Sequence, residues 1–507
     1  MTHLNVIDAV VCVGYLVVVV ALAVRSASGQ RSNEDYFIGG RRMNWVVVGI
    51  SLFATSFSSI SFLGLPQRGA YEDLSFYVTI LFIPLVITPI LWWVFVPIFV
   101  KLKVSSGYEY LGLRFGQAVR RMGSLLYCLY ALGWMGAMLH AVTLTLQAVL
   151  QLSPAQYYLA LIGVGGAATF YTVVGGLRAV VWTDVLQTVV LGGGIVLVLF
   201  LAVGRIEGGW SGFWSVAAEH DKLRMIHLRP GLLASENFTD RNSLFTAIAF
   251  GVFMYLPGYA VSQNMIQRYV CTGSVAAGRG VVVLSALINA VFGLVFLLAG
   301  TALFVFYAQA GAGRLPAAGG ALGSEDQILP YFVATEFPGV GLVGLILAGL
   351  FAAAMSTVDS GINGVTSVIV YDWMSGRERA LGTSRLLTLG LGVLAIGSAL
   401  LVPVFGSTVI GMINTIAGTT LGMLLAVYLL GLFVPWANGG GVMTGFGAGL
   451  LSLALAWTLT DVPRWWMGAF TTVPVFVVGM VASRWFARPP EAVLRGTLFA
   501  SLSRRNP

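Results

Sequence analysis

Residues 349–360 of this 507-residue chain read GLFAAAMSTVDS and place polar groups inside a run that is apolar enough to cross a bilayer. Ala353, Ser356, Thr357 and Ser360 stand at positions i, i+3, i+4 and i+7, so they share one face of a helix. Asp359 lies at the edge of that face. Hydroxyl, carbonyl and carboxylate oxygens on one stripe suit a small hard cation that has lost its water. The alternative is that the hydroxyls bond back to their own helix and that Asp359 pairs with a neighbouring helix.

Carboxylates inside apolar runs are the next candidates for functional residues. Of the twenty Asp and Glu residues, all but Asp8, Asp184 and Asp359 lie in loops or at clear ends of apolar runs. A carboxylate at membrane depth costs at least about 2.5–3.5 kcal/mol, and such residues are functional by default. Asp184 has a plainer interpretation as an acid at a helix N-terminus near Arg178. If Asp184 and Asp359 face one cavity, they cannot both stay ionised without a counter-charge, so either a second cation binds there or one carboxyl keeps a proton.

The elements that must position these residues are membrane helices. The chain has 58% hydrophobic and 9% charged residues and a mean hydropathy of +0.88, whereas a soluble domain carries about 25% charged residues. No soluble domain is expected. Apolar stretches long enough to cross a bilayer predict thirteen spans, at residues 5–25, 44–71, 76–100, 123–150, 156–175, 182–203, 243–266, 281–308, 340–371, 384–401, 406–434, 439–459 and 465–486.

The distribution of Lys and Arg predicts the orientation of these spans. With the N-terminus outside, twenty of the 28 cations lie in inner loops and the C-terminal tail, Arg268 among them. The odd number of spans then puts the C-terminus inside. The net charge of +8 follows from this topology and gives no reason to expect a nucleic-acid partner. A short outer helix is expected at about 325–336, where a Ser precedes Glu, Asp and Gln.

Two of the predicted spans carry helix breakers at corresponding places, five spans apart. The second span contains Gly64 and Pro66, and the seventh contains Pro257 and Gly258. Interrupted apolar segments at equivalent positions of two halves point to a transporter site at the midplane, where freed carbonyls bind a cation. We expect Gly64 and Pro66 to keep the second span unwound. The alternative is ordinary kinking and close packing, which are common in membrane helices.

Enzyme chemistry finds little support in the sequence. The chain has no HExxH, no pair of CxxC motifs and no Walker loop. Cys12, Cys128 and Cys271 are scattered without metal-ligand spacing. His140 could relay a proton, although a lone intramembrane histidine is more often a hydrogen-bonded residue between helices.

Ordered motifs along residues 5–435 resemble the sodium/solute symporter family. They include DYFIGGR at 35–41, YEYL at 108–111 with Arg114 and Phe115, WTDV at 182–185, Gln263 with QRY at 267–269, DQILPYF at 326–332 and AGLFAAAMST at 348–357. The resemblance implies an all-α membrane protein with a fold of the LeuT type, in which two inverted five-helix repeats contain broken helices. The whole of 1–507 is then one transporter domain, with a leading helix at 5–25, repeats at 44–203 and 243–434, and two trailing helices at 439–486.

The same resemblance implies the positions of the sites. The common sodium site of the family falls on the backbone carbonyls of Ala54, Phe57 and Ala353 and the hydroxyls of Ser356 and Thr357. A second sodium site, present in some members, falls on Asp184, Ser356, Asp359 and Ser360. Asp359 departs from the hydroxyl or small residue expected there, so that second site could hold sodium or a proton. The substrate is expected near Ser56, Ser58, Ser61, Ser262 and Gln263. At the four serine positions, relatives carry longer polar side chains such as Asn or Gln.

The resulting expectation is sodium-coupled symport of a small organic solute or anion across the inner membrane by alternating access. Its partners would be sodium, the substrate and the lipid bilayer, without a cofactor or enzymatic activity. Two alternatives stay open, a proton-coupled transporter and a membrane solute sensor that keeps the fold without transport. Only about twenty residues follow position 486, which argues against an appended signalling domain and therefore against the sensor.

Overall fold

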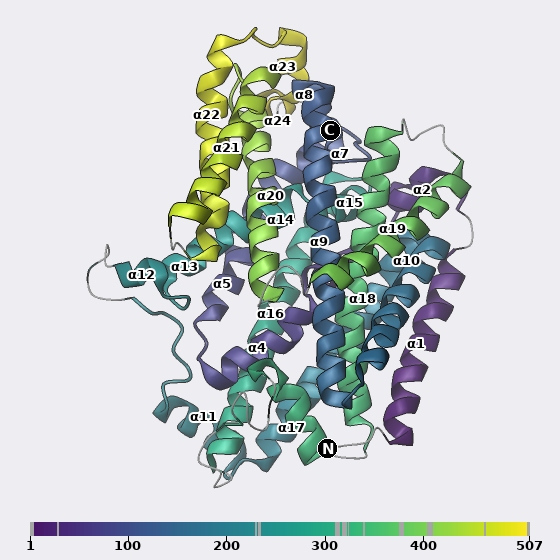
Figure 1. The fold of residues 1–507 in the computed structure, drawn as a ribbon, viewed down its shortest axis with the longest axis vertical. Helices are drawn as coiled ribbons and strands as arrows, with labels where there is room; N and C mark the ends of the chain where they lie inside the picture. The colour runs from purple at the N-terminus through teal and green to yellow at the C-terminus, as the bar shows by residue number, and fades with distance from the viewer. Residues whose placement is uncertain are drawn as a thin grey trace.

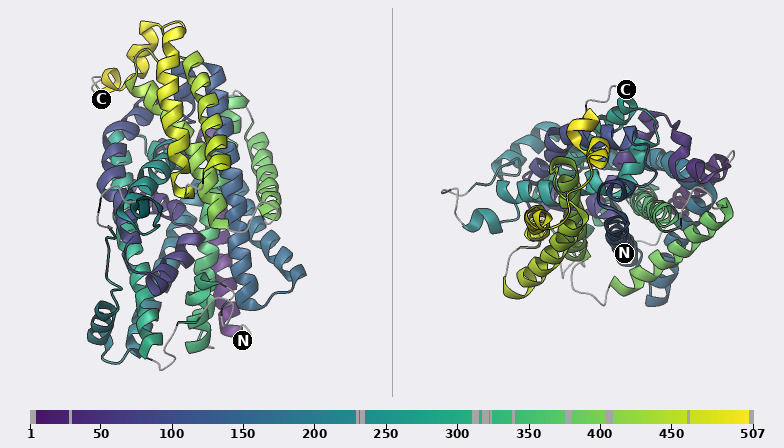
Figure 2. Two further views of the ribbon diagram at one scale, coloured as in Figure 1. Left: turned by 60° about the vertical axis from the view of Figure 1, so that its left-hand side comes forward. Right: turned by 90° about the horizontal axis from the view of Figure 1, so that it is seen from above.

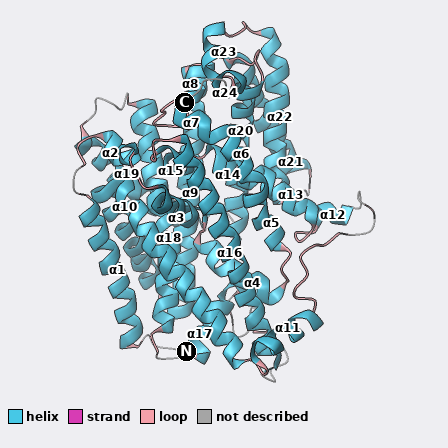
Figure 3. Cartoon of the chain, turned by 180° about the vertical axis from the view of Figure 1, so that it is seen from behind, coloured by secondary structure: helices cyan, strands magenta, loops and turns pink. Residues whose placement is uncertain are grey.

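The computed structural model describes residues 5–27, 30–228, 231, 235–309, 315–316, 322, 324–337, 340–374, 380–402, 409–460 and 463–503. These residues form a helical protein without β-strands, whose long helices follow the longest axis (Figures 1 and 3). The N-terminus lies at the end of the bundle that carries α11 (Gly209–Glu219) and α17 (Ile328–Glu336). The C-terminus lies at the opposite end, near α8 (Glu109–Phe115) and α7 (Val96–Lys101) (Figure 1).

The expectation of an all-helical membrane protein is confirmed, with about ten spans established. Ten described helices are long and apolar enough to cross a membrane, or eleven when one bent pair counts as a span. One of the ten, α10 (Pro154–Arg205), has 52 residues, which at 1.5 Å per residue would measure about 78 Å, more than twice a hydrocarbon core. Gly176 interrupts it with φ 54° and ψ −156°. A Cβ at Gly176 would lie 2.6 Å from the carbonyl oxygen of Tyr36, so only glycine fits this break.

The bent pair is the second predicted span, and its break lies upstream of the expected place. Helix α3 (Trp45–Ser56) ends where Phe57 and Ser58 become extended, and α4 (Ser59–Tyr71) then leaves at a bend of 68°. Gly64 and Pro66 lie inside α4, which continues through both. The expectation that these two residues unwind the span is therefore wrong. Pro66 stands in the middle of α4, where it removes one intrahelical hydrogen bond without ending the helix, as membrane helices commonly tolerate.

The seventh predicted span is also broken. It begins with α13 (Leu244–Phe250), passes through a π-helical turn, η4 (Gly251–Tyr255), and continues as α14 (Leu256–Val261). Ser262 is extended, with φ −81° and ψ 135°, and α15 (Gln263–Val270) follows it. Both broken spans therefore offer a helix C-terminus and a helix N-terminus in the interior of the bundle.

Helix α18 (Leu342–Val368) is the buried axis of the protein. Together with η6 (Ile369–Trp373) it forms a span whose most apolar window is 89% buried, and it packs against α10, α9 and α1. Small side chains such as Ala, Gly and Ser let the neighbouring helices approach closely. Asp8 of α1 (Val6–Ser26) accepts a hydrogen bond from the Gly344 amide at 2.9 Å, so an acid from another helix caps the N-terminus of α18.

The loop that follows α11 is attached to the C-terminal end of α4. Lys222 Nζ donates to the carbonyl of Ala70 at 2.7 Å and lies 4.1 Å from the ring centroid of Phe304. His227 Nε2 is 2.5 Å from the Asp73 carboxylate, just beyond α4. Burial lowers the pKa of the Lys222 ammonium group to about 8. The hydrogen bond to the Ala70 carbonyl places the ammonium group at the negative end of the α4 dipole, where a cation is favoured.

The remaining helices complete the bundle. They are α2 (Asn33–Ile38), η1 (Gly39–Arg41), α5 (Phe76–Phe82), η2 (Ile83–Ile87), α6 (Thr88–Ile90), η3 (Leu91–Phe95), α9 (Gln117–Leu150), α12 (Ser235–Thr239), α16 (Val275–Gln309), η5 (Glu325–Gln327), α19 (Leu381–Leu401), α20 (Val409–Phe433), α21 (Gly439–Leu459), η8 (Arg464–Trp466), α22 (Met467–Ala482), η9 (Ser483–Trp485), α23 (Glu491–Thr497) and α24 (Phe499–Ser503). Helices α21 and α22 pack on each other at one edge of the bundle (Figure 2). The short helix predicted at about 325–336 is confirmed as η5 followed by α17.

Candidate functional site

The hydroxyl stripe of α18 meets the end of α3. Ser356 Oγ donates to the carbonyl of Ala54 on α3 at 3.2 Å and to that of Ala353 on its own helix at 3.1 Å. Thr357 Oγ1 donates to the same Ala353 carbonyl at 3.2 Å. All four residues are at most 6% exposed. Four of the five residues expected to bind sodium are thus within hydrogen-bond distance of one another, away from bulk water.

The break after α3 explains why carbonyls are available here. Phe57 has φ −98° and ψ 96°, so the chain leaves the helix and the last carbonyls of α3 lack the next turn of amide donors. Ala54 and Phe57 supply two of these carbonyls. The full predicted ligand set contains five oxygens and no formal charge, which suits a monovalent hard cation. The hydroxyl hydrogens of Ser356 and Thr357 would turn away from the carbonyls when such an ion binds.

A buried ion pair lies one turn further along the stripe. Arg268 Nη2 is 3.0 Å from Asp184 Oδ2 and 2.6 Å from Ser360 Oγ, and Arg268 Nε donates to Ser51 Oγ at 2.9 Å. Both charged side chains are 0% exposed. The prediction that Arg268 lies in an inner loop is therefore wrong, because the break at Ser262 directs α15 into the protein. Asp184 has a cationic partner, so it is more than a helix-terminal acid.

Asp359 lies beside this ion pair. Its carboxylate accepts hydrogen bonds from Tyr171 Oη at 2.5 Å and from Ser360 Oγ at 3.1 Å, and Ser360 is also 3.1 Å from Thr55 Oγ1. Asp359 is 0% exposed. Asp184, Asp359 and Arg268 together carry one net negative charge when all are ionised. Ser360 connects the two carboxylates, because its hydroxyl contacts both Asp359 and Arg268, and Arg268 supplies part of the counter-charge.

Polar atoms near Asp184 have spare hydrogen-bonding capacity. Among the described residues, no partner is found for Asp184 Oδ1, for either polar atom of the Gln187 side chain, or for the Tyr15 hydroxyl. All three side chains are at least 92% buried. Unsatisfied polar atoms at such depth are costly, so these atoms are suited to coordinating a cation or an ordered water.

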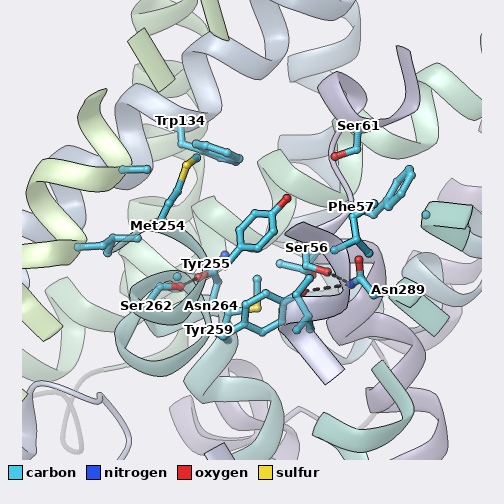
Figure 4. Close-up of a pocket in the computed structure, with 18 of the residues that line it drawn as sticks. Ser56, Phe57, Ser61, Trp134, Met254, Tyr255, Tyr259, Ser262, Asn264 and Asn289 are labelled. Atoms are coloured by element: carbon cyan, nitrogen blue, oxygen red, sulfur yellow. Dashed lines mark hydrogen bonds between the residues drawn. The ribbon is translucent and has the colours of Figure 1, made fainter. Parts of the chain in front are cut away.

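A cavity of about 100 Å³ lies between the two broken spans (Figure 4). Ser56, Phe57 and Ser61 line it from one broken span, and Tyr259 and Ser262 line it from the other. Helices α9 and α16 add Trp134 and Asn289. The cavity therefore includes three of the five residues that were expected to meet the substrate.

The other two expected substrate residues lie elsewhere. Ser58 is buried at the N-cap position of α4 and does not line the cavity. The Gln263 side chain accepts a hydrogen bond from the Gly107 amide at 2.8 Å and donates to the Ser105 carbonyl at 3.0 Å and to Ser367 Oγ at 3.1 Å. These three bonds use its polar atoms to join α15, α18 and the loop before α8.

Several cavity residues were missed by the sequence reasoning. Asn289 donates to Ser56 Oγ at 2.9 Å and to Tyr259 Oη at 3.1 Å, and Asn264 follows Ser262 at the start of α15. A count of intramembrane amides beside the count of acids would have singled out Asn289. Trp134 and Tyr255 carry no such signal, since aromatic residues are common throughout membrane helices. His140 Nδ1 lies 2.6 Å from Tyr157 Oη, which matches the hydrogen-bonded interpretation of that histidine.

Comparison with known proteins gives one consistent answer. The family model described as "Sodium:solute symporter family" matches residues 36–449. The chain is 29% identical over 489 residues to the sodium/sialic acid symporter SiaT of Proteus mirabilis, covering 95% of both chains. It is 34% identical over 450 residues to the human sodium/iodide cotransporter, covering 86% of this chain and 67% of the relative. It is 32% identical over 459 residues to human sodium-coupled monocarboxylate transporter 1, covering 87% and 72%.

Solved structures agree with the sequence comparison. A structure described as the substrate-bound outward-open state of a Na+-coupled sialic acid symporter superposes with a TM-score of 0.84 at 26% identity, covering 96% of this chain and 99% of the other. The nucleobase-cation-symport transporter Mhp1 superposes with a TM-score of 0.56 at 15% identity, covering 92% and 98%. The second match shows a shared fold alone.

Proposed function

The chain belongs to the sodium:solute symporter family, and we propose that sodium bound between α3 and α18 drives its transport cycle. The chain is a sodium-coupled symporter rather than an enzyme, and transport by alternating access fits its similarity to sodium-coupled symporters. The proposed sodium ligands are the carbonyls of Ala54, Phe57 and Ala353 and the hydroxyls of Ser356 and Thr357.

The observation that carries this proposal is the direct contact between Ser356 and the Ala54 carbonyl across two helices. An ion held by oxygens from both helices stabilises only the arrangement in which they are close. Sodium therefore shifts the equilibrium between transport states to the extent that its affinities for those states differ. Sodium and substrate then change each other's binding affinity by the same factor. Two sodium charges crossing about 100 mV would supply roughly 4.6 kcal/mol from the potential alone.

A second sodium ion is proposed at Asp184, Asp359 and Ser360. The single net negative charge left after Arg268 is counted supports one additional cation. The unpartnered Asp184 Oδ1 and the Gln187 side chain supply further oxygen atoms. Proton binding at this place is the alternative that sodium titrations of variants would distinguish.

Thirteen spans with the N-terminus outside and the C-terminus in the cytoplasm of a bacterium-like cell are also proposed. The interruption of α10 at Gly176 supports two spans in that segment. Helix α1 then leads, spans two to six and seven to eleven form the two inverted repeats, and α21 and α22 trail. The distribution of Lys and Arg supports this orientation.

The proposed substrate is a small organic solute or anion that binds in the cavity between the broken spans. The names of the relatives include sialic acid, iodide and monocarboxylates, so the family alone selects no single compound. Ser56, Ser61 and Ser262 line this cavity, which supports them as the proposed substrate contacts.

The first test measures uptake of candidate solutes into proteoliposomes with an imposed sodium gradient. The second measures thermal stabilisation of the purified protein by a panel of solutes, with and without sodium. Transport that needs sodium, and stabilisation by sodium that is lost in Ser356→Ala and Thr357→Ala, are expected. Sodium dependence that is unchanged in both variants would refute the assigned site.

A further inference from the structure

Two adjoining hollows lie where α2 and η1 meet the beginning of α3 and the middle of α10, in the same half of the bundle as the C-terminus (Figure 1). Their volumes are about 720 Å³ and about 630 Å³, and they share Ser32, Glu34, Gly40 and Arg42. The two hollows therefore form one groove, which we call the basic groove. None of its described lining residues borders the cavity between the broken spans or belongs to a proposed sodium site.

The lining of the basic groove has a positive net charge. Its charged residues are Arg41, Arg42, Lys103, Arg178, Glu34 and Asp35. Four cations and two carboxylates give a net charge of +2. Both carboxylates have partners close by in the sequence, since Glu34 pairs with Arg41 at 2.8 Å and Asp35 accepts hydrogen bonds from the Ser32 amide at 3.1 Å and the Ser32 hydroxyl at 2.9 Å. The remaining positive charge is not offset within the groove.

Three of the four cations have no partner. Among the residues that the structure describes, the side chains of Arg42, Lys103 and Arg178 form no hydrogen bond or ion pair. By contrast, Arg120 in the same half of the bundle pairs with Asp372 at 2.7 Å. The three unpaired cations are therefore available to an anion from outside the chain.

Two of these cations reach the groove from segments far apart in the sequence. Arg42 precedes α3, and Arg178 follows the break of α10 at Gly176 by two residues. Gly39 and Gly40 line the same hollow with φ of 59° and 65°, and their lack of side chains keeps the groove open between the two arginines. A guanidinium group is planar and can donate paired hydrogen bonds to the oxygens of a phosphate. Two such groups on one hollow suit a phosphate better than a carboxylate.

Exposed apolar side chains lie beside the basic groove. Trp182 of α10 lines it and is exposed, and Val189, which shares a helical face with Trp182, is also exposed. Helix α3 packs against α10 and exposes Trp45 and Val46 in its first turn. Tryptophan is enriched at the boundary between lipid headgroups and hydrocarbon. The groove is thus suited to a ligand that carries both a phosphate and hydrocarbon chains.

We propose that the basic groove binds one anionic phospholipid of the surrounding membrane. The phosphate lies between Arg42 and Arg178, Lys103 adds positive charge, and the acyl chains lie on the exposed apolar side chains of α10 and α3. Basic pockets between membrane helices bind acidic headgroups in this way. A lipid that binds only the folded chain stabilises that chain. The proposal is independent of the sodium ligands and of the substrate.

The experiment measures lipid binding to the purified, delipidated full-length protein in detergent by native mass spectrometry. The probes are phosphatidylglycerol, phosphatidylcholine and phosphatidylethanolamine with identical acyl chains, together with inorganic phosphate. We expect phosphatidylglycerol to bind about 10-fold or more tightly than either zwitterionic lipid and to raise the melting temperature, whereas inorganic phosphate should not raise it. Equal affinities for the three lipids, or tighter binding of a zwitterionic lipid, would overturn the proposal. Equal stabilisation by inorganic phosphate would show that the groove takes a free anion and would also overturn it.

Variants test the position of the lipid. Arg42→Gln combined with Arg178→Gln should reduce the preference for phosphatidylglycerol to about 2-fold or less. Both side chains are exposed and unpaired, so this variant should melt at the wild-type temperature in the absence of lipid. The matched control combines Arg484→Gln with Arg488→Gln, which removes the same charge from a different hollow near the C-terminus and should keep the preference. A preference that survives in the first variant, or that is lost equally in the control, would refute the proposed site.

Discussion

Removing the hydroxyl of Ser356 should weaken sodium binding by about 5- to 150-fold. The hydroxyl is 1% exposed and lies within 3.2 Å of two carbonyls that are proposed to share the ion. In Ser356→Ala no water can replace the lost oxygen without entering a packed interface, so the loss should reach the range of about 1–3 kcal/mol for a buried polar ligand. A free energy of that size corresponds to the stated change in affinity.

The assay is a sodium titration of thermal stability, repeated as a sodium titration of initial uptake rate in proteoliposomes. Both midpoints should move to higher sodium together, because both report the same binding step. The matched control is Thr366→Ala, which removes a fully buried hydroxyl from the same helix that donates only to the Ile362 carbonyl, at 2.7 Å.

Two results would refute the reasoning. A wild-type sodium midpoint in Ser356→Ala would show that the hydroxyl is no ligand. An equal shift in Thr366→Ala would show that the effect comes from general damage to α18 rather than from a lost ligand.

Further predictions concern the surrounding structure. Asp359→Asn should lower the Hill coefficient for sodium in uptake if a second sodium binds there, and an unchanged coefficient would argue against that ion. Arg268→Gln should reduce expression and thermal stability markedly, because it leaves the Asp184 carboxylate buried without its partner, at a cost of about 3–5 kcal/mol; a fully stable variant would contradict this. Gly176→Ala should lower the melting temperature, since the new methyl group would lie 2.6 Å from a carbonyl oxygen, with Gly163→Ala, which has open space, as the control. Since the Lys222 pKa is lowered from 10.5 to about 8 in the folded chain, the unfolded chain binds more protons between these values, so stability should gain from rising pH there; Lys222→Met should remove that gain in melting curves.

Helical periodicity was enough to locate the polar stripe of α18. Ser356, Thr357, Asp359 and Ser360 were found because a 3.6-residue repeat fixes which side chains share a face, whatever the neighbours are. Proline and glycine drew attention to the two broken spans, but Gly64 and Pro66 lie inside α4, and Pro257 and Gly258 lie inside α14. The exact break was less accessible: the chain turns at Phe57 and Ser58, which carry no special backbone chemistry.

Partners across helices could not be predicted from local pattern. Arg268 looked like one more cation of an inner loop, since positive residues near span ends usually are. Its burial depends on Asp184, 84 positions earlier, and on the direction that α15 takes after Ser262. Gln263 likewise resembled a substrate ligand until its three bonds to Gly107, Ser105 and Ser367 were seen.

The attachment of the α11–α12 loop to α4 makes that loop a natural reporter. Lys222 and His227 hold the loop to the end of α4, a half-helix that borders the cavity between the broken spans. A rotation of α4 would therefore pull the loop with it. Arg224 lies in the same loop and its side chain is 47% exposed, so a fluorophore or spin label can be attached there without changing any proposed sodium ligand. Its distance to a second label on an exposed part of α21 would report whether α4 rotates when sodium or substrate binds.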